Sequence, residues 1–230
     1  MSDKQKQSLV VSLELAQRRG SVAAKLGDGE IVELESVQGD RDRDSVMPSL
    51  DQVTSLVGGS PKNVDSVIVS VGPGGFTGLR VAVATAKMIS LATGASIVPV
   101  ETAIGVVGAD QHAPKKSLVV SAIKNSTFWL SIVDQGLGTC KSSLVEHEAL
   151  EQQLFEGGVL YGDSLISDEI RRICEAHSVE IRTTPSRASS IMIAGLALLA
   201  QGKTVAPNAL VPLYPREPEA VRNWKLRHPQ

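Results

Sequence analysis

Residues 67–93 read VIVSVGPGGFTGLRVAVATAKMISLAT, and this stretch contains the strongest pattern of the sequence. Its first five residues are apolar or small, which predicts a strand that is buried on both faces. A glycine-rich turn at 72–78 follows, and the apolar segment after it predicts a long helix that ends at about Thr93. A buried strand, a tight turn and a helix in this order are typical of an α/β layer.

The turn GPGGFTGLR, Gly72 to Arg80, admits two interpretations. Glycines allow positive φ angles and a close approach of the backbone, and free amides at the start of a helix can receive an anion. The spacing matches neither GxGxxG nor GK[ST], the two common phosphate-binding patterns. The turn is therefore either a binding loop or a tight connection needed for packing. As a binding loop it consists of Gly72, Pro73, Gly74, Gly75, Phe76, Thr77, Gly78 and Arg80.

The helix predicted over 76–93 is apolar around most of its circumference, and such a helix must be covered on two sides. It also carries a row of small residues at every fourth position, which allows another helix to approach closely. The row consists of Gly78, Ala82, Ala86 and Ser90. Either the chain's own sheet and helices cover this helix, or it forms a subunit interface. A subunit interface predicts that Ala82→Glu or Ala86→Arg abolishes pairing and leaves the monomer folded.

Three antiparallel strands are predicted before this unit, at Leu9–Leu15, Ser21–Leu26 and Glu30–Glu35. The turn Gly27-Asp28-Gly29 joins the second strand to the third. A charged loop at 38–44 and a helix over Ser45–Val57 lead to the central unit. After that unit, a strand at Ala95–Val100 and a short helix at Glu101–Ala109 continue the alternation of strands and helices.

The pattern of strands and helices restarts at Lys115. The predicted strands are 118–123, 127–133, 140–145, 158–161 and 179–182, and the predicted helices are 148–155, 163–177 and 189–201. Three strands followed by alternating helices and strands therefore occur twice, although no residue-level repeat is visible. The sequence predicts a duplicated architecture of two α/β units.

The composition excludes several classes of protein. The 230 residues are 42% hydrophobic and 21% charged, as in an ordinary globular protein, and the net charge of −2 gives no general attraction for nucleic acid. Two distant cysteines exclude a disulfide framework and a Cys-rich zinc site, and the four histidines lack the HxxxH spacing of a helical metal pair. His147, between two glutamates, is expected at the surface. The longest apolar run, 191–200, is too short for a membrane span and no secretory signal is visible, so a cytoplasmic protein is expected.

Residues 71–87 closely resemble the signature of the bacterial TsaB (YeaZ) family. This family provides the dimerisation subunit of the complex that makes N6-threonylcarbamoyladenosine at position 37 of tRNAs that read codons starting with A. The likeness continues at 98–102, 188–205 and 212–217. The resemblance implies an α/β, actin-like (ASKHA, ribonuclease H-like) fold of two related domains. The expected parts are domain 1–105, domain 106–215 with helix 189–201 packed back on the first domain, and a mobile tail at 216–230.

What the resemblance implies is a non-catalytic subunit. In such complexes a metal-bearing, TsaD-like sister subunit transfers the threonylcarbamoyl group, so tRNA is reached indirectly, and a small TsaE-like ATPase docks on the pair. The TsaB-like subunit pairs through the helices that correspond to 45–57 and 76–93, and it is a homodimer when alone. No cofactor of its own, no metal and no membrane contact are expected, while ATP or ADP is expected at the interface of the complex. The implied interface residues are Val46, Leu50, Val53, Leu79, Ala82, Val83, Ala86 and Ser90.

The end of the first strand departs from the family pattern at the phosphate side of the fold. The family has an Asp-Thr or Asp-Ser turn there, and this chain has Glu14-Leu15-Ala16. Glu14 is also the lone candidate for the alternative function, a nucleotide-binding enzyme of the actin-like and sugar-kinase superfamily. Such an enzyme needs acidic residues at strand ends to hold Mg²⁺. An enzyme should lose turnover when Glu14 is changed, and a scaffold should not.

The C-terminal stretch, 216–230, contains four Lys or Arg residues and Trp224. Basic residues together with an aromatic side chain suit contact with tRNA phosphates and a stacked base. The other interpretation is a solvated tail in which Glu217 and Glu219 offset part of the positive charge.

Overall fold

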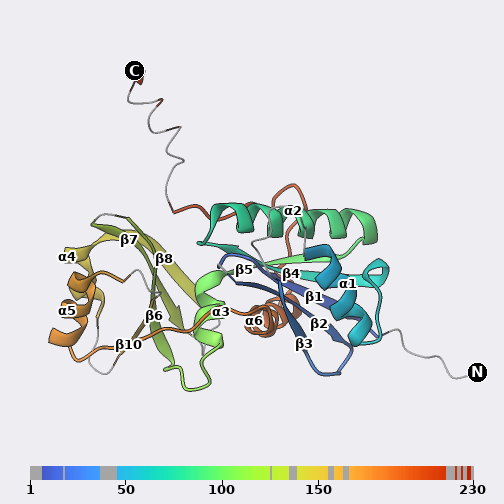
Figure 1. Cartoon of the computed structure of the whole chain (residues 1–230), viewed down its shortest axis with the longest axis horizontal. Helices are drawn as coiled ribbons and strands as arrows, with labels where there is room; N and C mark the ends of the chain where they lie inside the picture. The colour runs from blue at the N-terminus through green and yellow to red at the C-terminus, as the bar shows by residue number, and fades with distance from the viewer. Residues whose placement is uncertain are drawn as a thin grey trace, which may run out of the picture.

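The computed structural model of the chain is shown in Figure 1. It describes residues 7–17, 19–36, 46–124, 126–134, 139–154, 158–162, 166–215, 221, 224, 227 and 228, with the backbone alone at 122–124. The loop expected at 38–44 lies outside the described residues, as does most of the tail expected at 216–230.

The first half of the described chain forms a five-stranded sheet in the order β3-β2-β1-β4-β5. Its strands are β1 (Leu9–Glu14), β2 (Gly20–Leu26), β3 (Val32–Ser36), β4 (Val64–Gly72) and β5 (Ser96–Glu101). The pairs β1/β2 and β2/β3 are antiparallel, while β4 runs parallel to both β1 and β5. β1 and β4 are almost entirely buried, as the continuous apolar run of β4 predicts for a strand covered on both faces.

Helices cover both faces of this first sheet. On one face lie α1 (Val46–Leu56) and α2 (Phe76–Thr93), and on the other lies α6 (Ala188–Ala200), as Figure 1 shows. A short 3-10 helix, η1 (Pro61–Asn63), connects α1 to β4. Alternate residues of β4 point to opposite faces, so Val67 and Val69 join the core under α1 and α2, and Ile68 joins the core under α6.

The second half forms another five-stranded sheet in the order β10-β9-β6-β7-β8. Its strands are β6 (Lys116–Lys124), β7 (Thr127–Asp134), β8 (Thr139–Glu146), β9 (Val159–Tyr161) and β10 (Glu180–Arg182). The pairs β6/β7 and β7/β8 are antiparallel, and β6/β9 and β9/β10 are parallel. Taken in chain order, this is the connectivity of the first sheet, so the predicted duplication is present in the structure.

Two groups of helices pack on the second sheet. α4 (His147–Leu150), the 3-10 helix η2 (Glu151–Gln153) and α5 (Asp168–Ala176) lie at one side, and α3 (Thr102–Gly108) lies between the two sheets (Figure 1). The helix predicted at 148–155 is therefore wrong in form, because α4 ends after four residues and continues as a 3-10 turn. The helix predicted from residue 163 begins at Asp168, where the Ser167 hydroxyl accepts a hydrogen bond from the Ile170 amide at 3.3 Å and caps the helix.

The chain returns from the second sheet to the first through α6. The Ala188 amide donates to the Ser21 hydroxyl at 2.8 Å and to a Glu33 carboxylate oxygen at 3.1 Å, so strands β2 and β3 provide the cap for the start of α6. After α6, residues 203–215 lie against the first sheet. The Val205 amide donates to the Ile97 carbonyl at 2.9 Å, and the Leu213 amide donates to the Val71 carbonyl at 2.7 Å. The domain boundaries expected from the sequence stay a prediction.

Among the described residues, every helix is too short or too polar to span a membrane.

Candidate functional site

The carboxyl ends of three parallel strands meet at one edge of the first sheet. β1, β4 and β5 end at Glu14, Gly72 and Glu101. In open α/β sheets, ligands bind outside the carboxyl ends of the strands. The glycine-rich loop follows β4 directly, so this edge is the place to look for a site.

The glycine-rich loop packs against the turn that follows β1. The Gly75 amide donates to the Ala16 carbonyl at 2.7 Å, and a Cβ at Gly74 would lie only 2.4 Å from the same oxygen. Gly74 is therefore needed for this close approach. Gly74, Gly75, Phe76, Thr77 and Arg80 are exposed at the surface, whereas Gly72, Pro73 and Gly78 are buried.

Glu14 lies beneath this loop with no exposed surface. Its Oε1 accepts a hydrogen bond from the Ala16 amide at 2.7 Å, and its Oε2 accepts one from the Ser186 hydroxyl at 2.8 Å. Burial raises the pKa of the Glu14 carboxyl, and the hydrogen bonds from Ser186, Ser70 and Ala16 partly oppose that rise. The carboxyl group is held by donors of its own chain and does not reach the surface.

Three polar residues of this buried cluster were not predicted from the sequence. Ser186 precedes α6 and is 172 positions from Glu14, and the Ser70 and Thr102 hydroxyls form a hydrogen bond of 2.8 Å across β4 and the start of α3. Their positions in the sequence do not indicate a common site, because only the folded structure brings them together. The cluster has the geometry of a buried structural network that joins the segment before α6 to the first sheet.

The residues predicted for the dimer interface lie inside the chain. Each of the eight is buried: Val46, Leu50, Val53, Leu79, Ala82, Val83, Ala86 and Ser90. The small row of α2 does permit a close approach, but the element that approaches is β4 of the chain's own sheet. These residues are therefore wrong as contact residues for a partner, whereas an interface that involves α2 stays a prediction. For the same reason Ala82→Glu is no longer expected to leave the monomer folded.

The opposite face of α2 is exposed and apolar. Val81 is 39% exposed, Met88 57% and Leu91 77%, and these residues are spaced so that they lie along one side of the helix. Large apolar side chains that line one helix face in water are typical of an interaction surface. We call Val81, Ala84, Met88 and Leu91 the outer face of α2; all four are exposed.

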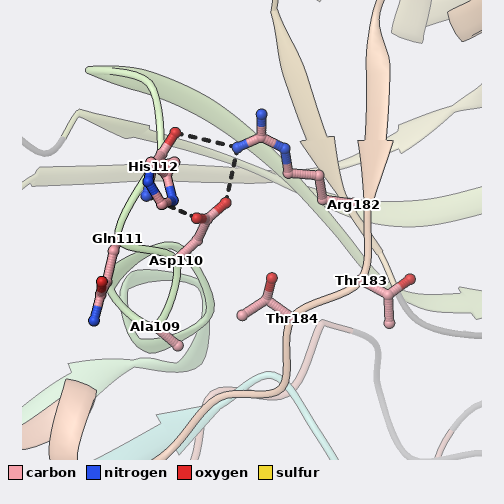
Figure 2. Close-up of a pocket in the computed structure, with 7 residues that line it drawn as sticks. All are labelled: Ala109, Asp110, Gln111, His112, Arg182, Thr183 and Thr184. Carbon is pink, nitrogen blue, oxygen red and sulfur yellow. Dashed lines mark hydrogen bonds and ion pairs between the residues drawn. The ribbon is translucent and has the colours of Figure 1, made fainter.

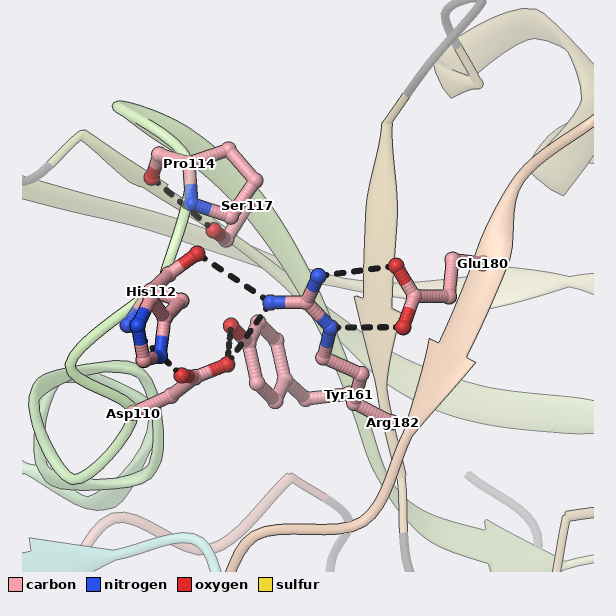
Figure 3. Close-up of polar contacts among 7 residues, drawn as sticks. All are labelled: Asp110, His112, Pro114, Ser117, Tyr161, Glu180 and Arg182. Carbon is pink, nitrogen blue, oxygen red and sulfur yellow. Dashed lines mark hydrogen bonds and ion pairs between the residues drawn. The ribbon is translucent and has the colours of Figure 1, made fainter.

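A second polar cluster joins the two connections between the sheets. One connection leaves α3 at Asp110, and the other leaves β10 at Arg182. The Arg182 guanidinium donates to Asp110 Oδ2 at 2.9 Å and binds both carboxylate oxygens of Glu180 at 2.8 Å, while the Tyr161 hydroxyl donates to Asp110 Oδ2 at 2.7 Å (Figure 3). We call Asp110, Tyr161, Glu180 and Arg182 the connection clamp.

The pKa values of the connection clamp follow from these contacts. Hydrogen bonds from Tyr161, His112 and Arg182 lower the pKa of Asp110 to about 2. Burial and the bond to Asp110 raise the pKa of Tyr161 to about 12. Each group therefore keeps one protonation state near neutral pH, which suits a structural role better than proton transfer.

An open pocket of about 670 Å³ lies beside the connection clamp. Figure 2 shows that its walls come from the two connections, with Gln111 and His112 on one and Thr183 and Thr184 on the other. The Arg182 guanidinium in its wall is already bound by two carboxylates, so it offers little to an anionic ligand. This pocket was not predicted from the sequence.

His147 is buried, which contradicts the expected surface position. Its ring stacks on Phe128, and its Nδ1 lies 2.7 Å from a Glu169 carboxylate oxygen. Across the described part of the chain, His, Cys, Asp and Glu side chains nowhere gather in a group of three that could hold a metal ion.

Comparison with known proteins gives one family match and two structural matches. Residues 39–146 match the family model described as TsaD, tRNA N6-adenosine threonylcarbamoyltransferase. The structure resembles YeaZ from Pseudomonas aeruginosa, with a TM-score of 0.76 at 16% identity over 90% of this chain and 99% of that chain. It also resembles an uncharacterized protein with similarity to peptidase YeaZ from Pseudomonas aeruginosa, with a TM-score of 0.75 at 15% identity over 91% and 100% of the two chains. No curated protein sequence matches this chain.

These findings confirm the expected fold class. The chain has an α/β, actin-like fold of two related domains, and it shares that fold with YeaZ over nearly its whole length. All three matches agree with the resemblance to the TsaB (YeaZ) family that the glycine-rich stretch indicates.

Proposed function

We propose that the chain is a TsaB-like, non-catalytic subunit required for threonylcarbamoyl transfer to N6 of adenosine 37 in tRNAs that read codons starting with A. A metal-bearing, TsaD-like sister subunit carries out the transfer, and a small TsaE-like ATPase acts on the pair. The match of residues 39–146 to the TsaD family model and the shared fold with YeaZ support a role in this tRNA modification.

The observation that carries the proposal is the outer face of α2. The small row of this helix is buried in the chain's own core, whereas Val81, Met88 and Leu91 are exposed on the opposite side. Burying such a face against a second subunit removes apolar surface from water, at about 25 cal/mol for each Å². The partner proposed for this face is the sister subunit, and a second copy of the chain takes its place when the chain is alone.

The position of Glu14 supports a scaffold over a nucleotide-binding enzyme. An acidic residue that holds Mg²⁺ must present its oxygens to the metal, and those of Glu14 accept hydrogen bonds from Ala16 and Ser186 inside the fold. ATP or ADP is proposed to bind at the interface of the complex rather than to the chain alone.

The test is reconstitution of the modification with purified components. Unmodified tRNA, threonylcarbamoyl-adenylate and the sister subunit are combined with and without this chain, and the modified nucleoside is quantified by mass spectrometry. Product that forms only when both subunits are present is the expected result. Met88→Asp is expected to abolish product, and Ile193→Asp is the matched control, because Ile193 is an equally exposed apolar residue on α6. Full product without this chain would contradict the proposal.

A further inference from the structure

Two exposed aromatic rings and an arginine lie together at the start of α2. Phe76 is 53% exposed and Tyr214 is 36% exposed, and their ring centroids are 5.2 Å apart with a tilt of 30°. The Arg80 guanidinium lies 5.2 Å from the centroid of the Phe76 ring, within the range of a cation–π contact. We call Phe76, Arg80 and Tyr214 the aromatic cluster. The predicted partner surface, the outer face of α2, begins beside it and continues along the helix.

The backbone holds the aromatic cluster in place. The Leu213 amide donates to the Val71 carbonyl at 2.7 Å, which fixes the segment after α6 beside the last residues of β4. A Cβ at Gly72 would lie 2.8 Å from the Leu213 carbonyl oxygen, so the two backbones are in close contact. Tyr214 follows this contact directly, and Phe76 is the first residue of α2. A ring fixed in this way loses little conformational freedom when a ligand stacks on it.

The segments that build this surface lack acidic residues. Residues 66–100 and 203–215 contain no Asp or Glu, in a chain that has 25 of them. The neighbouring turn after β1 adds Arg19, which is exposed, and this turn contacts the glycine-rich loop through the Gly75–Ala16 hydrogen bond. Positive charge is therefore present on α2, at Arg80, and on the turn after β1, at Arg19.

The chain that leaves the aromatic cluster is basic. Residues 216–230 hold four of the 23 Lys and Arg residues and two of the 25 Asp and Glu residues, so they carry a formal charge of +2. Residues 1–215 carry the remaining −4. Its first six residues hold Arg216 against Glu217 and Glu219, so the net positive charge comes from Arg222, Lys225 and Arg227, which follow Tyr214 by eight residues or more.

From this arrangement we propose that the aromatic cluster binds an unpaired segment of RNA. A base stacks on the exposed Phe76 and Tyr214 rings, and Arg80 and Arg19 neutralise the adjacent phosphates, which is how single-stranded nucleic acid is held on other protein surfaces. An apolar protein partner is the less favoured occupant, because a charged guanidinium lies beside the Phe76 ring and Arg19 is exposed on the neighbouring turn. The inference rests on the proposed function for the identity of the RNA, and it makes the contact with tRNA direct.

The experiment measures binding of RNA to the full chain without its sister subunit. The probe is a fluorescein-labelled, unmodified tRNA transcript that reads a codon starting with A, titrated by fluorescence anisotropy at 50 and 200 mM salt. Phe76→Ala and Tyr214→Ala are each expected to weaken binding about tenfold, because each removes a stacking surface. Leu144→Ala is the matched control, since Leu144 is exposed on β8 at the far sheet, and it should bind as the unchanged chain does.

Further variants separate stacking from charge and from misfolding. Arg80→Ala and Arg19→Ala are expected to weaken binding and to reduce the slope of log affinity against log salt by about one each. Arg171→Ala, an exposed arginine on α5, should leave both unchanged. Phe76→Trp keeps a stacking ring and should restore binding that Phe76→Leu loses, whereas a purely structural role would be served by either residue.

Three outcomes overturn the inference. One is no binding of the transcript by the chain at 50 mM salt, and another is equal loss of affinity in Phe76→Ala and Leu144→Ala. The third is a Phe76→Ala chain that keeps its RNA affinity and loses its pairing with the sister subunit, because the aromatic cluster is then a protein docking surface. That third outcome is compatible with the proposed function. Failure of the proposed function appears instead in the reconstitution, where full product would form without this chain.

Discussion

Glu14 is an acidic residue that the fold encloses completely. Its hydrogen-bond donors come from β4, from the turn after β1 and from the segment before α6, so it links three parts of the chain. A comparison of sequences shows that Glu14-Leu15-Ala16 departs from the family pattern. It cannot show that Ser186, 172 positions away, donates a hydrogen bond to Glu14. Glu14, the residue expected at a nucleotide cleft, has both carboxylate oxygens hydrogen-bonded within the chain, and nucleotide binding at this place stays a prediction.

Replacing Glu14 by Gln should change how stability depends on pH. Because burial raises the folded-state pKa above 4.5, the folded chain holds the proton more tightly than the unfolded chain does. The unfolding free energy therefore falls as pH rises from the unfolded pKa through the folded pKa, by about 1.4 kcal/mol for each unit between the two values. Glu14→Gln lacks this titration, so its stability relative to the unchanged chain should increase from pH 4 to pH 8 in thermal unfolding. A difference that stays constant with pH would contradict the assignment.

Two neighbouring glycines of the loop offer a matched pair. A Cβ at Gly74 meets the Ala16 carbonyl at 2.4 Å, whereas the nearest atom to a Cβ at Gly75 is the same oxygen at 3.5 Å. Gly74→Ala should cost about 1–3 kcal/mol of unfolding free energy, because the loop must move away from the turn. Gly75→Ala should cost less than about 1 kcal/mol, and urea unfolding of the two variants distinguishes them. Equal losses would mean that the loop does not pack on Ala16.

At the level of elements, α2 is the helix for which the sequence was most informative and also misleading. Its bounds, its glycine-rich start and its end at Thr93 all follow from the sequence. The sequence does not show which side faces the core, because both sides are apolar and a helix of this kind has little amphipathic contrast. The small row, which indicates a close approach, faces β4, and the larger side chains Met88 and Leu91 face outward.

The two faces of α2 predict opposite results for the same substitution. Ala82→Glu places a carboxylate in the core, where Ala82 has no exposed surface, and should destabilise the fold by several kcal/mol. Ala84→Glu, two residues on, places it on the exposed face and should leave folding intact while it weakens pairing. Circular-dichroism melting curves of both variants measure folding, and size-exclusion chromatography of both variants measures pairing. A folded Ala82→Glu chain would reverse the assignment of the faces.

At the level of the whole molecule, the duplicated order of strands was predictable and the junction between the halves was not. Both sheets have the same connectivity, which the repeated pattern of three strands and alternating helices indicates. The connection clamp joins residues 110, 161, 180 and 182, and each of them alone is an ordinary polar residue of a loop or strand. They meet only because the segment that follows α3 places Asp110 against Tyr161 of β9 and Arg182 of β10.

The connection clamp should contribute to stability down to strongly acidic pH. The pKa of Asp110 is lowered from 3.8 to about 2, so its contribution is present above the unfolded value and is lost as pH falls through about 2. Asp110→Asn should cost about 1–2 kcal/mol at neutral pH, because an amide accepts less well from Tyr161 and Arg182. Glu180→Gln is the control, since Glu180 is mostly exposed and should contribute less. Guanidinium unfolding at pH 7 and pH 3 measures the effect of each variant on the unfolding free energy, and equal effects would contradict the assignment of Asp110 as the main contributor to the clamp.

The most direct test of the central claim is the mass of the complex that the chain forms. Size-exclusion chromatography with light scattering is applied to the chain alone and to its mixture with the cognate metal-bearing sister subunit. A homodimer that exchanges into a one-to-one heterodimer, and that Met88→Asp disrupts while Ile193→Asp does not, is the predicted result. A chain that forms no heterodimer, even with nucleotide and the small ATPase present, would contradict the scaffold function, and nucleotide turnover by the chain itself would then be measured.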